Sequence, residues 1–288
     1  MNAQEILFRI RRFEPAGDRK PEWEEYRLPY GSGMTVLDGL RRLKETVAPS
    51  LAWRSSCRMG VCGSCGMSIN GRPRLACNTQ IAELGSATVV VAPLANFDTV
   101  RDLVPDLSPM FEAHAALRPY ILREDAQQPL EDDQPPQREY AQTPAQLERY
   151  LQYSYCIKCG CCMAACPTYA TDIRYSGPMP LAQAQRYNAD SRDTGFQQRK
   201  AVLGGDRGPW RCHYAGECSR VCPKGVDPAK AIQWLRRELV LDALRLRRRR
   251  AAAELVEIPQ LIHRRPDIPE PPVPTVRGPA DRSAGGSS

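Results

Sequence analysis

The stretch CRMGVCGSCGMSINGRPRLAC, which runs from Cys57 to Cys77, contains four cysteines at the spacing Cys-x4-Cys-x2-Cys-x11-Cys. Four thiolates at this spacing are typical of a 2Fe-2S cluster site. Three of its glycines, Gly60, Gly63 and Gly66, lie between or beside the first three cysteines and permit the tight loop that brings backbone N–H groups close to the sulfurs. A zinc site is the alternative, but zinc sites usually combine two Cys-x2-Cys pairs, and this stretch has one. The predicted ligands of the 2Fe-2S cluster are Cys57, Cys62, Cys65 and Cys77.

The residues around this loop predict a small domain of strands and one helix. ILFRIRRF (residues 6–13) alternates like a half-buried strand, and EEYRLPY fits as its hairpin partner. Thr35 and Asp38 form a capping-box pattern at a helix start. The expected apolar face of this helix comprises Val36, Leu40, Leu43 and Val47. Two more strands fit SINGRPRLACN and SATVVVAP. This order predicts a plant-type 2Fe-2S ferredoxin domain with a β-grasp fold over residues 1–117.

Two further cysteine runs follow. The first is Cys156-x2-Cys159-x2-Cys162-x3-Cys166-Pro167, the spacing of bacterial ferredoxins, in which the fourth cysteine binds the other of two clusters. The second is Cys212-x5-Cys218-x3-Cys222-Pro223, which matches the same pattern except at its second ligand place, where Ala215 stands.

Crossed ligation between these runs predicts two unequal clusters. The predicted ligands of a 4Fe-4S cluster are Cys156, Cys159, Cys162 and Cys222. The remaining set is Cys166, Cys212 and Cys218, and a cubane with one protein ligand missing tends to lose an iron, which leaves a 3Fe-4S cluster. An open iron with an outside ligand is the alternative. Cys161 cannot point at the same cluster as its neighbour, so it is expected to be a buried small hydrophobe rather than a redox-active thiol.

The rest of the chain predicts an α+β protein. A polar, Pro-rich linker is expected at residues 118–143, an all-α bacterial-ferredoxin-like domain with two clusters at 144–250, and a Pro-rich tail at 251–288. TPAQLERYLQY reads as a helix, and Asp227 with Pro228 predicts the start of another.

Composition excludes several other functions. Twelve cysteines without a secretory signal indicate metal ligation, and three histidines are few for most zinc sites. No apolar run is long enough to span a bilayer. The net charge of +7 and the arginines of residues 245–250 suggest either a solvated helix end or anionic lipid, and not nucleic acid. No catalytic acid–base pair, nucleophile or dinucleotide fingerprint is present.

Four segments resemble the iron–sulfur subunits of succinate dehydrogenases and fumarate reductases: SCRMGVCGSCGMSINGRPRLAC, YCIKCGCCMAACPTY, QRYNADSRDTG and RCHYAGECSRVCPKGVDPAKAIQ. The resemblance covers about residues 5–240. It implies electron transfer from the FAD of a flavoprotein subunit, where the succinate chemistry takes place, through the three clusters to a membrane quinone. It also implies membrane-anchor subunits, with haem b as an option, that hold the chain peripherally at the cytoplasmic face of the cell membrane.

The same resemblance indicates residues near the quinone, namely Pro167, Trp210 and His213. His213 would either hydrogen-bond the quinone or serve the cluster and backbone. A Trp that some ubiquinone-linked members carry after Cys166 is missing, and Arg236 stands about where several members have Lys, which favours menaquinone. The direction of the reaction stays open. The alternatives are a subunit of another flavoprotein dehydrogenase, a free polyferredoxin, and a zinc-stabilised interaction protein.

Overall fold

The structure is a computed structural model that describes residues 4–15, 20–123, 138–172, 174–247 and 253–257. The chain forms two compact units, the larger of residues 1–129 and 140–254 and the smaller of residues 130–139 and 255–288. All of the cysteines belong to the larger unit. A two-stranded sheet joins β8 (Arg138–Ala141) and β9 (Glu254–Glu257).

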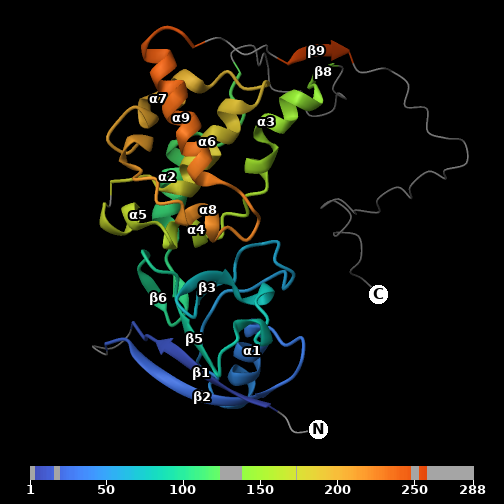
Figure 1. The fold of residues 1–288 in the computed structure, drawn as a ribbon, viewed down its shortest axis with the longest axis vertical. Helices are drawn as coiled ribbons and strands as arrows, with labels where there is room; N and C mark the ends of the chain where they lie inside the picture. Colours follow the sequence, from blue (N-terminus) through green and yellow to red (C-terminus); the bar gives the residue numbers. More distant parts are fainter. Residues whose placement is uncertain (1–3, 16–19, 124–137, 173, 248–252, 258–288) are drawn as a thin grey trace, which may run out of the picture. The chain divides into compact units, whose positions relative to one another are not determined.

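A five-stranded sheet forms the N-terminal part of the larger unit (Figure 1). Its strands, in the spatial order β2-β1-β5-β3-β4, are β2 (Glu22–Tyr30), β1 (Gln4–Arg12), β5 (Thr88–Ala92), β3 (Gly66–Ile69) and β4 (Arg72–Leu75). β1 pairs with β5 in parallel, and the other pairs are antiparallel. Ile6, Phe8 and Ile10 alternate along β1 and are buried. The predicted strands are therefore confirmed, and Asn70 and Gly71 form the turn between β3 and β4.

The predicted helix is α1 (Val36–Thr46). Its capping box is present, because Asp38 N donates to Thr35 Oγ1 at 3.2 Å and Thr35 N donates to the Asp38 carboxylate at 3.1 Å. Val47 was expected on the apolar face and is 59% exposed, so that part of the prediction is wrong. The helix ends at Thr46, and the chain turns so that Ala48 is buried in its place.

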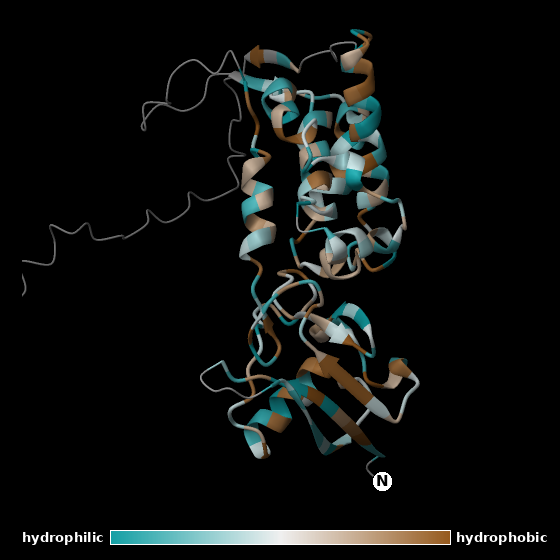
Figure 2. Ribbon diagram, turned by 90° about the vertical axis from the view of Figure 1, so that its left-hand side faces the viewer, coloured by the Kyte–Doolittle hydropathy of each residue, from teal (hydrophilic) through white to brown (hydrophobic). Residues whose placement is uncertain are grey.

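The C-terminal part of the larger unit is helical. Its longer helices are α2 (Ser108–Ala116), α3 (Pro144–Ser154), α6 (Pro178–Ala189), α7 (Phe196–Leu203) and α9 (Pro228–Ala243). Asp227 caps α9, as predicted, and Thr143 caps the predicted helix α3. α6 contacts α2, α3 and α9 and is buried on most sides. Hydrophobic and hydrophilic residues are interspersed along the helices in Figure 2, as expected where each helix turns one face inward.

Short elements make up the remainder. They are β6 (Thr99–Arg101), β7 (Val104–Pro105), α4 (Cys161–Ala164), α5 (Pro167–Thr171), α8 (Glu217–Arg220), and the 3-10 turns η1 (Ala76–Asn78), η2 (Ala82–Leu84) and η3 (Pro209–Arg211). α2 lies within the range predicted for the first domain, yet its Met110 is buried with Met163 and Met179 of the helical part. The predicted domain limits stay a prediction.

Part of the basic run and nearly all of the tail lie outside the described residues. Arg247 is described, and its Nε donates to the Glu238 carboxylate at 2.9 Å. Its guanidinium also lies 3.7 Å from the centroid of the Phe196 ring. These contacts favour the interpretation of this arginine as part of a helix end that folds back on α7 and α9.

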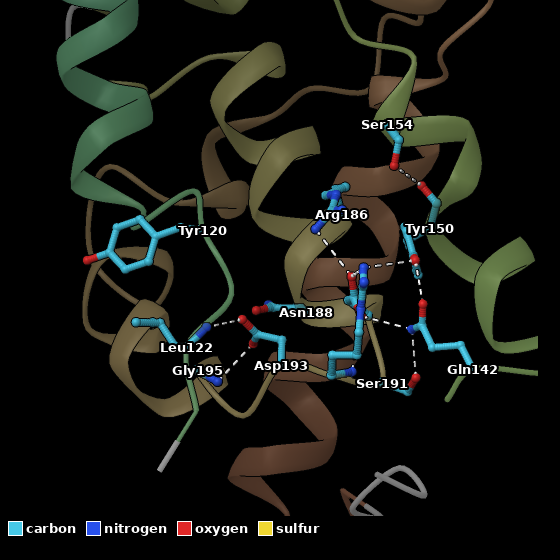
Figure 3. A network of polar contacts seen from close by, with 12 residues as sticks. Tyr120, Leu122, Gln142, Tyr150, Ser154, Arg186, Asn188, Ser191, Asp193 and Gly195 are labelled. Atoms are coloured by element: carbon cyan, nitrogen blue, oxygen red, sulfur yellow. Dashed lines mark hydrogen bonds and ion pairs between the residues drawn. The ribbon is translucent and has the colours of Figure 1, made fainter. Parts of the chain in front are cut away.

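A buried arginine fixes the segment that follows α2. Arg199 on α7 is fully buried, and its Nη1 and Nη2 donate to the two carboxylate oxygens of Asp193 at 2.7 and 2.8 Å. Its Nη2 also donates to the Tyr120 carbonyl at 2.7 Å. Asp193 in turn accepts from the backbone of Leu122 and Gly195, as Figure 3 shows. One ion pair therefore holds residues 117–122 against the loop before α7.

A second buried carboxylate, that of Asp190, lies three residues before Asp193; two of the side chains that contact it, Gln142 and Arg186, are labelled in Figure 3. Asp190 is buried, and its carboxylate accepts hydrogen bonds from Arg192 at 2.9 and 2.8 Å and from Gln142 at 3.0 Å. Arg186 is 3.3 Å away. Burial opposes ionisation of Asp190, but these hydrogen bonds and charges outweigh it and lower its pKa. The chain before α3 is thereby tied to the end of α6.

We predict that Arg199→Met lowers the free energy of unfolding by about 3–5 kcal/mol, because the change leaves the Asp193 charge buried without its partner. Denaturant unfolding followed by tryptophan fluorescence measures the change. Arg174→Met is the control, since that side chain is 62% exposed and its ion pair with Asp172 is long at 3.6 Å. The control is expected to stay within about 1 kcal/mol of the parent protein. Equal, small effects of the two changes would contradict the prediction.

Candidate cluster-binding sites

The loop before β3 brings the first four cysteines together. Cys57 Sγ accepts hydrogen bonds from the backbone N–H groups of Val61 at 3.3 Å and Cys62 at 3.2 Å. Gly60 N donates to Cys77 Sγ at 3.2 Å, and the Sγ atoms of Cys65 and Cys77 lie 3.3 Å apart. N–H groups aimed at sulfur stabilise an anionic cluster and raise its potential. The geometry therefore fits a 2Fe-2S cluster.

The thiols of this loop differ in their surroundings. Burial raises the pKa of Cys65 to about 12, whereas a hydrogen bond to the Ser64 side chain lowers the pKa of Cys62 to about 6. Cys65 and Cys77 face the core, and the side chain of Met59 at the tip of the loop is 73% exposed. A metal that binds here must displace the proton of a buried thiol, so metal binding and local folding are coupled.

The second group of cysteines lines a cavity between α4 and the start of α9. Its cysteines are Cys156, Cys159, Cys162 and Cys222. The rest of its wall is mostly apolar and includes Met179, Ala182 and Val226. Burial raises the pKa of Cys162 well above its usual value. Four thiols in an apolar cavity fit a cubane cluster, because the positive charge of its irons offsets the negative charge of the thiolates.

The third cavity is lined by Cys166, Cys212 and Cys218. Two of these sulfurs accept backbone hydrogen bonds, Cys166 from Tyr169 N and Cys212 from Tyr214 N, each at 3.4 Å. Ala215 also lines this cavity and offers no donor atom. The three thiols and the alanine together fit a cluster with one iron fewer than a cubane.

Cys166 and Cys222 thus each lie in the cavity that holds the other cysteine run. Cys166 shares its cavity with the second run, and Cys222 shares its cavity with the first. Within the described part of the chain, no three His, Cys, Asp or Glu side chains converge as ligands of a single metal ion do. Cys161 lines neither cavity and is fully buried beside Leu94 and Ala164, as expected of a small core residue.

Comparison with known proteins supports both cluster-binding parts. The model of a 2Fe-2S iron-sulfur cluster binding domain matches residues 7–112, and that of a 4Fe-4S dicluster domain matches residues 152–226. The fumarate reductase iron-sulfur subunit of Haemophilus influenzae is 44% identical over 237 residues, which cover 80% of this chain and 91% of the relative. The succinate dehydrogenase iron-sulfur subunit of Coxiella burnetii is 36% identical over 240 residues, with 82% and 98% covered.

The chain belongs to the family of succinate dehydrogenase and fumarate reductase iron–sulfur subunits. A chain of the solved Mycobacterium smegmatis Sdh1 complex in the apo form agrees, with a TM-score of 0.70, 28% identity, and coverage of 84% of this chain and 97% of that one. The predicted fold class and the predicted role, electron transfer within an oxidoreductase complex, are confirmed. Among the described residues, none of the helices has the length and apolarity to cross a membrane.

Of the three residues predicted near the quinone, only Pro167 lines the third cavity, and Trp210 and His213 lie close to Cys212 in the sequence. Pro167 lines the cavity and is exposed, Trp210 is 50% exposed on η3, and His213 is exposed beside Cys212. Their grouping follows from the neighbouring ligands, and their role stays a prediction.

Arg236 has a structural role that was not predicted from the sequence. Its guanidinium donates to the carbonyls of Pro209 at 2.9 Å and Trp210 at 3.2 Å, and also to that of Cys212. It lies 5.8 Å from the centroid of the Trp210 ring. Because three carbonyls share one cation, Arg236 holds the loop that carries Cys212 against α9.

Asn96, which follows β5, plays a similar part for the loop that carries Cys166. Its Nδ2 donates to the carbonyls of Met163 and Ala164, both at 3.0 Å, and of Cys166 at 3.3 Å. Asn96 has a φ of 64°, a left-handed conformation that asparagine adopts more readily than most residues. The ferredoxin part therefore fixes the segment between Cys162 and Cys166, one in each cavity. No local sequence pattern marks this contact.

We predict that Asn96→Gly lowers the free energy of unfolding by about 1–3 kcal/mol, because several carbonyls lose a donor. The change keeps the left-handed backbone and removes the amide. Iron and sulfide are expected to fall at the second and third sites and to stay at the first. Denaturant unfolding and the EPR intensity of each cluster measure both effects. Asn96→Asp, of the same shape but with no amide donor, serves as the matched variant and is expected to be at least as harmful. Full cluster content in both variants would contradict the prediction.

Proposed function

We propose that the chain carries three clusters with the ligand sets predicted from its sequence. The 2Fe-2S cluster is held by Cys57, Cys62, Cys65 and Cys77. The 4Fe-4S cluster is held by Cys156, Cys159, Cys162 and Cys222. The 3Fe-4S cluster is held by Cys166, Cys212 and Cys218. The observation that most strongly supports this is the exchange of Cys166 and Cys222 between the two cavities of the helical part.

The third cluster lacks one iron because Ala215 stands where a fourth thiolate would bind. The cavity is small, and its other wall residues include Pro167, Tyr175 and Ile232. Burial is the main reason that the pKa of Tyr175 is raised, so its phenol stays protonated and is a poor ligand. The Glu217 carboxylate also lines this cavity, but it accepts a hydrogen bond from Arg220 Nη1 at 2.7 Å. By this proposal neither side chain replaces the missing thiolate.

The partners follow from the family. A flavoprotein subunit supplies electrons from FAD, and the clusters, when bound, accept and pass them one at a time to a quinone. The residues of this chain orient the clusters, donate N–H groups to their ligands and exclude water. Anchor subunits, with or without haem b, would hold the chain at the cytoplasmic face of the membrane. Relatives named for both succinate dehydrogenase and fumarate reductase support a reaction in either direction.

The quinone end lies by this proposal at the third cavity, where Pro167, Trp210 and His213 are exposed. Menaquinone is the proposed quinone, since no Trp follows Cys166 and Arg236 replaces Lys. Because Arg236 already binds three backbone carbonyls, its role at this end is to hold the loop of Trp210 and His213. We keep the domain limits of 1–117, 144–250 and 251–288 as part of the proposal.

Single substitutions distinguish crossed from uncrossed ligation. Cys222→Ala is expected to remove the 4Fe-4S EPR signal of the reduced complex and to leave the oxidised 3Fe-4S signal. Cys166→Ala is expected to do the reverse. Cys161→Ala, a neighbouring cysteine that lines neither cavity, is the control and should keep all three signals. If Cys222→Ala removed the 3Fe-4S signal instead, or if the parent complex held zinc or fewer than three clusters, the proposal would be wrong.

We also predict that Ala215→Cys converts the 3Fe-4S cluster into a 4Fe-4S cluster, because the new thiolate lies in the same cavity as the other three ligands. The oxidised 3Fe-4S signal should then disappear while the iron content rises. Ala170→Cys, an exposed position on α5 outside that cavity, should leave the spectrum unchanged. A folded Ala215→Cys protein with the parent spectrum would refute the prediction that Ala215 occupies the place of the missing fourth ligand.

A further inference from the structure

The loop that carries Cys57, Cys62 and Cys65 contacts the cysteine run of residues 156–166 at two glycines, Gly63 and Gly66. A Cβ added at Gly63 would lie 2.9 Å from the Cys159 Cβ and 2.9 Å from the Ile157 carbonyl oxygen. A Cβ added at Gly66 would lie 2.8 Å from the Cys159 carbonyl oxygen. These separations are well inside van der Waals contact, and the opposing carbonyls are backbone atoms that cannot rotate away. Glycine at both positions therefore sets how closely the two loops approach.

The two glycines differ in a way that makes the contact testable. Gly63 has a φ of +77°, so its backbone conformation alone favours glycine. Gly66 lies outside the left-handed region, and only the contact with Cys159 excludes a side chain there. By contrast, a Cβ at Gly31 would meet nothing within 4 Å.

The contact is held from both sides. Gly66 N donates to the Gly63 carbonyl at 3.2 Å, and the Cys65 carbonyl accepts from Ala76 N at 3.1 Å. Cys159 packs against the cluster of Leu94, Cys161 and Ala164, and Leu94 Cδ1 also lies 3.5 Å from the place of a Cβ added at Gly66. Asn96, two residues after Leu94, holds the carbonyls that follow Cys162. A side chain forced into the contact must therefore move one of the two ligand-bearing loops.

We propose that Gly63 and Gly66 are positioning residues for electron transfer between the first and second clusters. This inference rests on the proposed ligand sets, in which Cys62 and Cys65 hold the first cluster and Cys159 the second. The step transfers a single electron: the 2Fe-2S site is oxidised by one electron, the 4Fe-4S site is reduced by one, and no bond or proton changes. Because electron tunnelling slows steeply with distance, a route that crosses one backbone contact is fast, and the two glycines make that route available.

Gly66→Ala in the purified complex tests the proposal. The expected result is a full complement of clusters with unchanged midpoint potentials, and a several-fold slower reduction of the 4Fe-4S site after rapid mixing with succinate. The magnetic interaction between the two reduced clusters, seen as faster relaxation of the 2Fe-2S EPR signal, is expected to weaken. A purely structural role would not change rate and interaction together while leaving the potentials unaltered.

Gly31→Ala is the matched control, an open glycine that follows the edge strand β2, and should keep the parent rate and relaxation. Parent-like rate and relaxation in Gly66→Ala would overturn the inference. If the Gly66→Ala complex fails to assemble, the parent complex provides a second test. A 2Fe-2S signal of the parent complex that relaxes no faster when the second cluster is reduced would also overturn the inference. Failure of the proposed function looks different, because a cluster would then be missing from the parent complex itself.

Discussion

The sharing of Cys166 and Cys222 between the two cavities is the constraint on which the helical part depends. Each cysteine belongs by sequence to one run and by position to the other. Neither cavity is complete until the segment around α4 lies against the segment around α8. Burial raises the pKa of Cys156 and of Cys218, the latter to about 11, so these thiols resist ionisation until iron binds. Folding of the helical part and cluster assembly are therefore coupled.

The features that could be predicted from the sequence are those with a short-range physical cause. The capping box of Thr35 and Asp38 and the N-cap Asp227 act within one helical turn, and both are found where predicted. The cysteine runs carry the same kind of information, because ligand spacing is limited by how tightly a chain wraps a cluster. Val47 shows the limit of periodicity. The apolar pattern continues past Thr46, but the helix does not, since Ala48 fills the core position.

The contacts that the sequence did not predict are long-range and specific to one packing arrangement. Asn96 is a common residue for a turn, and only the folded chain shows that its amide reaches three carbonyls beside Cys166. Arg199 would ordinarily be placed on the surface of a short helix, yet it is buried because Asp193 neutralises it and nearby carbonyls take its remaining donors. Met110 of α2 packs with Met163 and Met179, more than 50 residues further along the chain, and no local pattern indicates this contact.

These unpredicted contacts share a principle. Asn96 binds backbone carbonyls, Arg236 binds backbone carbonyls, and Gly66 faces the backbone carbonyl of Cys159. Each contact thus places the main chain of a ligand-bearing loop rather than a side chain of it. Main-chain positions are set by hydrogen bonds and by steric exclusion, neither of which depends on the identity of most residues in the loop. The rate of electron transfer depends on the distance between clusters. Because these contacts act on the main chain, most substitutions elsewhere in the loops are expected to leave the separation of the ligands unchanged. The positions that are sensitive to substitution are then a glycine and a few polar side chains.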